Sequence, residues 1–159
     1  MFNSLFKKLG RGYRETEELL RAGKIFDAYD SVKNRKEEEA RLLSGLFLII
    51  MKKNKKGLEI ILQVKATGEN LLGKELFCEI VGTSFYTEGN YLEATIYFTE
   101  VLKINPENFN TLFNMTSIYL NKKDYESAYK NLSKMIILRP GDESVKRNYN
   151  MVKEKLNKN

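Results

Sequence analysis

The sequence predicts an all-α protein built as a row of antiparallel helix pairs. Apolar residues recur at helical spacing along most of the chain, and one set of residues repeats at a fixed distance of 34 positions. A repeat of this length is typical of arrays in which stacked units bury one continuous core. The length of 159 residues corresponds to one domain, 1–159. Only 2 Pro and 10 Gly interrupt it, too few for a chain dominated by linkers.

A Tyr, an Ala and a Pro mark the repeat. Each copy contains two helix-length stretches, which are 75–87 and 91–103 in the first copy. Asn90 precedes the second stretch and is a suitable N-cap, and the Pro after it disfavours helical geometry in the residue that precedes the Pro. The three marker residues of the two copies are Tyr91, Ala94 and Pro106, then Tyr125, Ala128 and Pro140.

This pattern resembles the tetratricopeptide repeat, a 34-residue helix–turn–helix unit with small and aromatic residues at fixed positions. The departures are Cys78 and Leu112, which stand where Trp is usual, and Thr116, which stands for Gly. The resemblance implies a right-handed α-solenoid, a tetratricopeptide-like superhelix with clear units at 75–108 and 109–142. The residues that carry it are Val81, Gly82, Phe85, Ala94, Phe98 and Pro106, then Met115, Tyr119, Ala128, Leu132 and Pro140.

The rest of the chain follows the pattern more loosely. Ala28 and Ile61 stand at 33-residue steps before Ala94, which predicts divergent helix pairs at 9–41 and 42–74. Residues 143–159 are expected to form a capping helix, because the end of such an array needs a solvated outer face. In this helix we expect Val145, Tyr149, Val152 and Leu156 to face inward, and Lys146, Lys153 and Lys155 to face solvent.

Most large apolar residues of the two clear units are expected to pack helix against helix. Cys78 falls on such a position and is expected to be a small buried side chain rather than a reactive thiol. The expected packing residues are Phe85, Tyr91, Ala94, Phe98, Tyr119, Tyr125, Ala128 and Leu132.

Composition argues against catalysis. The chain has no His and one Cys, which removes His-based acid–base chemistry, imidazole metal sites and internal disulfides. It also lacks a complete Gly-rich phosphate loop and a nucleophile elbow. We therefore expect no catalytic residues, no cofactor and no metal. The single Cys fits a reducing compartment, and we expect a cytoplasmic protein.

The charge distribution argues against a nucleic-acid partner. The net charge is +6, but it is unevenly spread. Residues 41–74 hold seven Lys and Arg against two Asp and Glu, whereas residues 75–108 hold one against six. A nucleic-acid binder concentrates positive charge on one continuous surface, and here an acidic block interrupts the basic segments.

Two apolar segments raise the question of a membrane. The stretch 42–51 is too short for a membrane span of about 20 residues, so we expect a buried core helix. Residues 1–10 place apolar side chains at helical spacing with a basic opposite face. This segment is expected either to dock on the core or to lie on an anionic membrane surface.

The resemblance implies that a ligand lies in the concave groove lined by the first helix of each pair. Glu79 and Phe113 stand where relatives that clamp a chaperone-tail carboxylate have Lys, which argues against such a clamp. We expect a non-catalytic adaptor that binds a peptide or an amphipathic helix of another protein. The alternatives are a membrane-surface accessory protein and a self-associating protein whose groove is filled by its own N-terminal segment or by a second copy. The expected groove residues are Leu76, Glu79, Thr83, Tyr86, Asn110, Phe113, Asn114, Ser117, Asn121 and Arg147.

Overall fold

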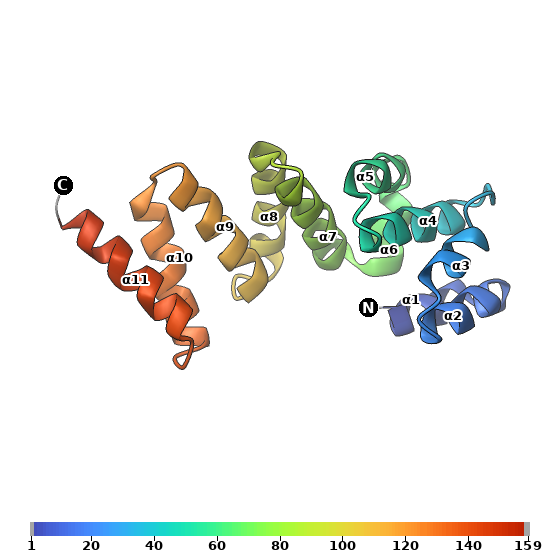
Figure 1. Ribbon diagram of the computed structural model, residues 1–159, viewed down its shortest axis with the longest axis horizontal. Helices are drawn as coiled ribbons and strands as arrows, with labels where there is room; N and C mark the ends of the chain where they lie inside the picture. The colour runs from blue at the N-terminus through green and yellow to red at the C-terminus, as the bar shows by residue number, and fades with distance from the viewer. Residues whose placement is uncertain (1, 158–159) are drawn as a thin grey trace.

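The computed structural model describes residues 2–157, with side chains from Leu5 onward, and this part of the chain contains helices and no strand. The helices form an elongated row, with α1–α3 at one end and α11 at the other (Figure 1). The predicted all-α, tetratricopeptide-like solenoid is confirmed. The elements are α1 (Phe2–Leu9), η1 (Arg11–Tyr13), α2 (Arg14–Arg21), α3 (Ile25–Asp30), α4 (Glu38–Ile50), α5 (Asn54–Gln63), α6 (Lys65–Leu72), α7 (Lys74–Thr87), α8 (Tyr91–Ile104), α9 (Phe109–Asn121), α10 (Tyr125–Leu138) and α11 (Glu143–Leu156).

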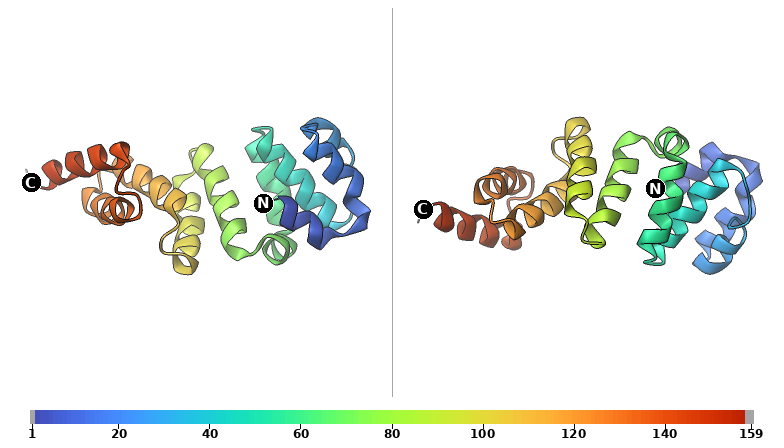
Figure 2. Two further views of the ribbon diagram at one scale, coloured as in Figure 1. Left: turned by 90° about the horizontal axis from the view of Figure 1, so that it is seen from below. Right: turned by 90° about the horizontal axis from the view of Figure 1, so that it is seen from above.

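The N-terminal half differs in detail from the expected pairs 9–41 and 42–74. Helix α4 begins at Glu38, before the expected boundary, and the short helix α6 follows α5 as an unexpected element (Figure 2). Val64 leaves helical geometry between α5 and α6, with φ −116° and ψ 33°. Gly73 ends α6 with a φ of 85°, which is a backbone conformation that favours glycine.

Helices α7 and α8 approach each other at Gly82. A Cβ atom on Gly82 would lie 2.8 Å from Cδ1 of Phe98, whose side chain is fully buried. Ala94 is also fully buried in α8 and shares a core cluster with Phe98 and with Met115 and Ile118 of α9. The core therefore runs from one helix pair into the next.

The long apolar stretch forms the buried helix α4, as predicted. Leu42, Leu43 and Phe47 are fully buried. At the crossing of α4 and α5 the two backbones are in contact, because a Cβ atom on Gly57 would lie 2.8 Å from the carbonyl oxygen of Gly45. Glycine at both positions removes the side chains that would hold these helices apart.

The predicted packing residues are confirmed with one correction. Tyr91 is 36% exposed, because it is the first residue of α8 and lies at the edge of the core, where its ring is 5.7 Å from that of Tyr86. Asn90 takes the N-cap position, but its side chain makes no capping hydrogen bond. The other seven are buried or half-buried: Phe85, Ala94, Phe98, Tyr119, Tyr125, Ala128 and Leu132.

The final helix α11 covers the end of the row. Val145 and Val152 are buried against α10, and the hydroxyl groups of Tyr149 and Tyr129 lie 2.7 Å apart. Asp142 caps the helix by accepting hydrogen bonds from two backbone N–H groups. The expected inward face of 143–159 and its solvated Lys146, Lys153 and Lys155 are confirmed in the described part.

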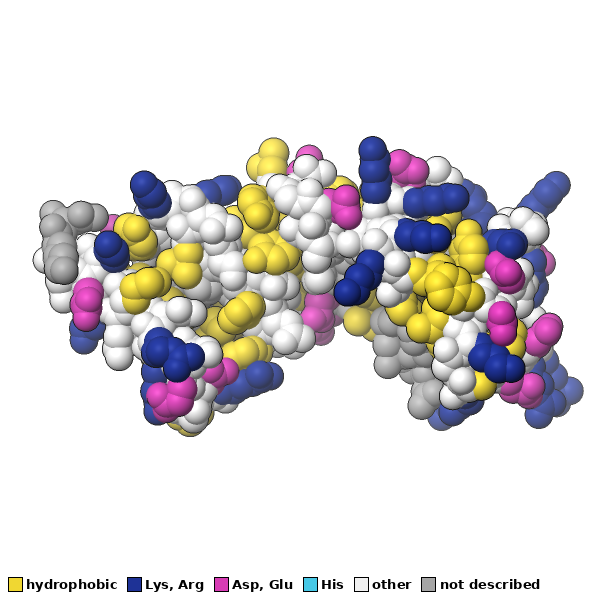
Figure 3. All heavy atoms as spheres, in the orientation of Figure 1, with side chains coloured by type: hydrophobic (Ala, Val, Ile, Leu, Met, Phe, Trp, Pro, Cys, Tyr) yellow, Lys and Arg dark blue, Asp and Glu magenta, His cyan; other side chains and the backbone are white. Residues whose placement is uncertain are grey.

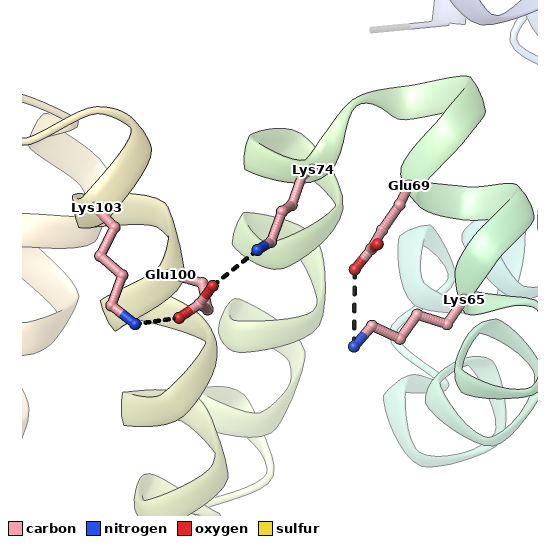
Figure 4. A network of polar contacts seen from close by, with 5 residues as sticks. All are labelled: Lys65, Glu69, Lys74, Glu100 and Lys103. Atoms are coloured by element: carbon pink, nitrogen blue, oxygen red, sulfur yellow. Dashed lines mark hydrogen bonds and ion pairs between the residues drawn. The ribbon is translucent and has the colours of Figure 1, made fainter.

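An ion bridge on the surface joins α7 to α8 (Figure 4). The carboxylate of Glu100 accepts hydrogen bonds from Nζ of Lys74 at 2.9 Å and from Nζ of Lys103 at 2.5 Å. These two bonds lower the pKa of Glu100 from 4.5 to about 2. Figure 4 also shows the separate pair of Lys65 and Glu69 on α6, at 3.7 Å.

We expect Gly57→Ala to lower the free energy of unfolding by about 1–3 kcal/mol, because the new Cβ meets backbone atoms that cannot move aside. The higher helix propensity of Ala, about 1 kcal/mol, opposes this loss. Urea unfolding followed by circular dichroism measures the change. Gly141→Ala is the control, because no atom lies within 4 Å of its added Cβ. Equal urea midpoints for the two variants would contradict the close contact between α4 and α5.

The carboxyl of Glu100 should titrate near pH 2 in a carbon NMR experiment, against its ordinary 4.5. Because folding lowers this pKa, the ion bridge stabilises the fold above about pH 4.5, and this contribution is lost as the pH falls toward 2. Replacing Lys74 and Lys103 by Gln should raise the pKa toward its ordinary value, whereas Lys155→Gln should leave it unchanged. An unshifted pKa in the wild-type protein contradicts the bridge.

Candidate functional site

One side of α9 carries most of the expected groove residues. Asn110, Ser117 and Asn121 lie three to four positions from the adjacent pair Phe113 and Asn114 or from one another, so these side chains share one side of the helix. The ring of Phe113 is 45% exposed, whereas the opposite side of α9 is buried in the core. This side of α9 therefore presents an aromatic ring among hydroxyl and amide groups.

The expected residues of α7 adjoin this side of α9. Leu76, Glu79, Thr83 and Tyr86 are all half-buried. Glu79 makes the connection, because its Oε1 accepts a hydrogen bond from Nδ2 of Asn110 at 3.3 Å. We call these four residues and the five expected residues of α9 together the α7–α9 face.

Tyr86 and Arg147 differ from the other expected residues. Tyr86 also packs into the core, and Arg147 lies away from the α7–α9 face. The ring of Tyr86 packs against the core cluster shared by α8 and α9, so it supports the fold as well as bordering the face. Arg147 is exposed on α11, where its Nη2 donates a hydrogen bond to Ser144 Oγ at 3.1 Å. No described contact joins Arg147 to the α7–α9 face.

A network of two carboxylates and three amides lies at the edge of this face. Nδ2 of Asn108 lies 3.2 Å from Oε1 of Glu75 and 3.2 Å from Oε2 of Glu79. Nδ2 of Asn105 donates to the same Oε1 of Glu75 at 2.8 Å. Within the described part of the chain neither carboxylate forms an ion pair. The amides fix the positions of both charges without neutralising them.

Sequence reasoning missed Glu75, Asn105 and Asn108. The segment 105–108 was expected only to end a helix, but Oδ1 of Asn108 also caps α9 by accepting from the N–H of Thr111 at 2.9 Å. With its oxygen used as a cap, the amide nitrogen of Asn108 points to α7. The available signal was the one-turn spacing of Glu75 and Glu79, which places both carboxylates on the same side of α7.

An open pocket of about 480 Å³ lies beside these carboxylates. Its walls combine apolar groups, two carboxylates and the cation of Lys74, whose Nζ is paired with Glu100 on α8. The two carboxylates without an ion pair suit a long side chain with an apolar stem and a positive head. The residues that line it are Leu72, Gly73, Lys74, Glu75, Leu76, Glu79 and Ile104.

The described part of the N-terminal segment does not cover the α7–α9 face. Leu5 and Phe6 are buried in the core cluster that includes Leu42. Nζ of Lys8 donates to the carbonyl oxygen of Leu71 at 2.8 Å, which places α1 against α6. Met1 lies outside the described residues.

The remaining observations concern the single thiol, metal-binding side chains and membrane-spanning helices. Cys78 is 2% exposed, and burial raises the pKa of its thiol, which keeps it protonated and unreactive. Residues 2–157 contain no group of three or more His, Cys, Asp and Glu side chains arranged to hold a metal ion. Over the same residues no helix has both the length and the apolar character needed to cross a membrane.

We expect Asn108→Asp to lower the free energy of unfolding by about 1–2 kcal/mol, because it retains the cap but replaces a donor by a third carboxylate beside Glu75 and Glu79. Urea unfolding measures the change. The reverse exchange at the equivalent cap of α10, Asp124→Asn, is the control and should change stability by only about 0.5 kcal/mol. If Asn108→Asp leaves the free energy of unfolding unchanged, the amide donors do not stabilise the fold.

No protein-family model matches this chain, and no curated protein matches its sequence. Among solved structures, MamA AMB-1 superposes with a TM-score of 0.76 at 18% identity, over 91% of this chain and 81% of that chain. MamA MSR-1 gives 0.71 at 19% identity, over 91% and 85%. MamA from Desulfovibrio magneticus RS-1 gives 0.70 at 15% identity, over 92% and 90%. At these identities the similarity establishes the fold, and the chain has the helical-repeat solenoid architecture of these structures.

Proposed function

We propose that this protein is a non-catalytic adaptor that binds a peptide or helix of a partner protein on the α7–α9 face. The observation that carries the proposal is the exposed ring of Phe113 on a contiguous polar face of α9. A half-exposed aromatic ring gives a partner a large apolar contact at a low cost in side-chain entropy. The amides of Asn110 and Asn114 can bond to the backbone of a bound segment.

The acidic edge of the face adds a preference for a basic partner. Glu75 and Glu79 are held in place by amide donors, and among the described residues neither forms an ion pair with a Lys or Arg. A Lys or Arg of the bound segment supplies that cation, and its apolar stem fits against Leu76 in the neighbouring pocket. Negative potential at this position also disfavours an acidic tail, in agreement with the argument against a carboxylate clamp.

The structure supports the membrane-surface alternative less well. Leu5 and Phe6, which would have to enter a lipid surface, are buried in the core. Because these apolar side chains of α1 are already packed in the core, they are not available to insert into lipid. Self-association through the α7–α9 face is a second form of the same binding, in which the bound segment comes from another copy of the chain.

The test is a comparison of proteins recovered with tagged wild-type chain and with two single variants. Phe113→Ala should reduce recovery of the specific partner by roughly tenfold or more, because an aromatic anchor carries a large share of binding energy. Glu79→Lys should reduce it similarly by placing a cation where the partner's cation binds.

Ile137→Ala is the matched control for this test, because Ile137 is 80% exposed on α10, outside the α7–α9 face. It removes apolar surface without touching the proposed site and should leave recovery unchanged. Circular dichroism establishes that all variants are folded. Undiminished recovery by both Phe113→Ala and Glu79→Lys rules out binding on this face.

A further inference from the structure

A second concave site lies at the other end of the row, where the connection between α3 and α4 faces α5. The pocket has a volume of about 410 Å³. Four of its lining side chains are cationic and none is acidic. Figure 3 shows several Lys and Arg side chains over the α4–α6 part of the molecule, with some Asp and Glu side chains among them. The lining residues are Lys33, Arg35, Lys36, Arg41, Ser44 and Ile60.

Arg35 is held in place by the N-terminal helices. Its guanidinium carbon lies 4.3 Å from the centroid of the Tyr13 ring. One Nη atom donates to the carbonyl oxygen of Gly12 at 3.1 Å and the other to Oε1 of Glu37 at 3.2 Å. A guanidinium has five N–H donors, so these contacts orient the group and leave donors for a ligand.

The four cations are only partly neutralised. Lys33 pairs with Asp30 at 2.7 Å and Arg35 pairs with Glu37, and both carboxylates lie outside the lining of the pocket. Arg41 donates to the side-chain amide oxygen of Gln63, a neutral partner. Glu39 also lies near enough to Arg35 to interact with its charge. Among the described residues Lys36 and Arg41 form no ion pair with a carboxylate, so these two cations are available to an anionic ligand.

From this arrangement we infer that the pocket binds the phosphate group of a small phosphorylated molecule. A phosphate dianion takes several charge-assisted hydrogen bonds, and Arg side chains match its geometry. Ser44, on the wall of the pocket, adds a hydroxyl donor. The pocket is open to solvent, and its volume of about 410 Å³ lies in the range of small-molecule sites. The inference does not depend on the α7–α9 face, which lies on other helices.

Binding of inorganic pyrophosphate, measured by titration calorimetry at low salt, tests the site. Wild-type protein should bind it. Arg41→Gln and Lys36→Gln should each weaken binding by about tenfold, because each removes an uncompensated cation. Lys155→Gln is the control for a general loss of one positive charge, since Lys155 is exposed on α11, and it should bind as wild type does. Urea unfolding establishes that each variant is folded.

A peptide of four Glu residues, titrated in parallel, separates phosphate from carboxylate recognition. It should bind at least about tenfold more weakly than pyrophosphate, because a carboxylate carries one charge and fewer acceptor oxygens. The inference is wrong if wild-type protein shows no pyrophosphate binding. It is equally wrong if Lys155→Gln loses as much affinity as Arg41→Gln, or if the peptide binds as tightly as pyrophosphate.

Discussion

Close contact between the two helices of a pair is the constraint on which the structure depends. Gly45 and Gly57 bring the backbones of α4 and α5 together, and Gly82 makes room for the ring of Phe98 between α7 and α8. A helix pair alone cannot bury its apolar side. Once the pair is tight, Phe98 also reaches Met115 of α9, and each unit completes the core of its neighbour.

The same geometry leaves a functional surface uncovered. Packing uses the side of α9 that carries Leu112, Met115 and Ile118, so the ring of Phe113 on another side of the helix stays partly exposed. Asn108 joins the two surfaces, since its side-chain oxygen caps α9 while its amide nitrogen fixes the carboxylates of α7. The N-cap of α9 therefore also determines where the carboxylates of α7 lie.

Local signals explain which parts of the fold the sequence predicted. The Tyr and Pro markers lie close to helix ends, and the predicted stretches 75–87 and 91–103 agree within one residue with α7 and α8. Upstream, single positions such as Ala28 and Ile61 could not reveal the break at Val64 that separates α6 from α5. The bonds of Asn105 and Asn108 to Glu75 join residues about 30 positions apart, and such amide orientations depend on the folded geometry rather than on any local pattern.

The basic and acidic side chains of the chain form two separate sites in the folded row. Basic side chains surround the pocket between α3 and α5, while Glu75 and Glu79 lie at the edge of the α7–α9 face. In a solenoid each unit contacts only its neighbours, so an effect of one ligand on the other must pass through α5 and α6, which both contact α7. Nδ2 of Asn54 and Oγ1 of Thr87 are 2.9 Å apart there, an exposed hydrogen bond of about 1 kcal/mol. Leu42 of α4 and Phe77 of α7 also belong to one buried core cluster, so packed side chains join α4 to α7 in addition to this hydrogen bond.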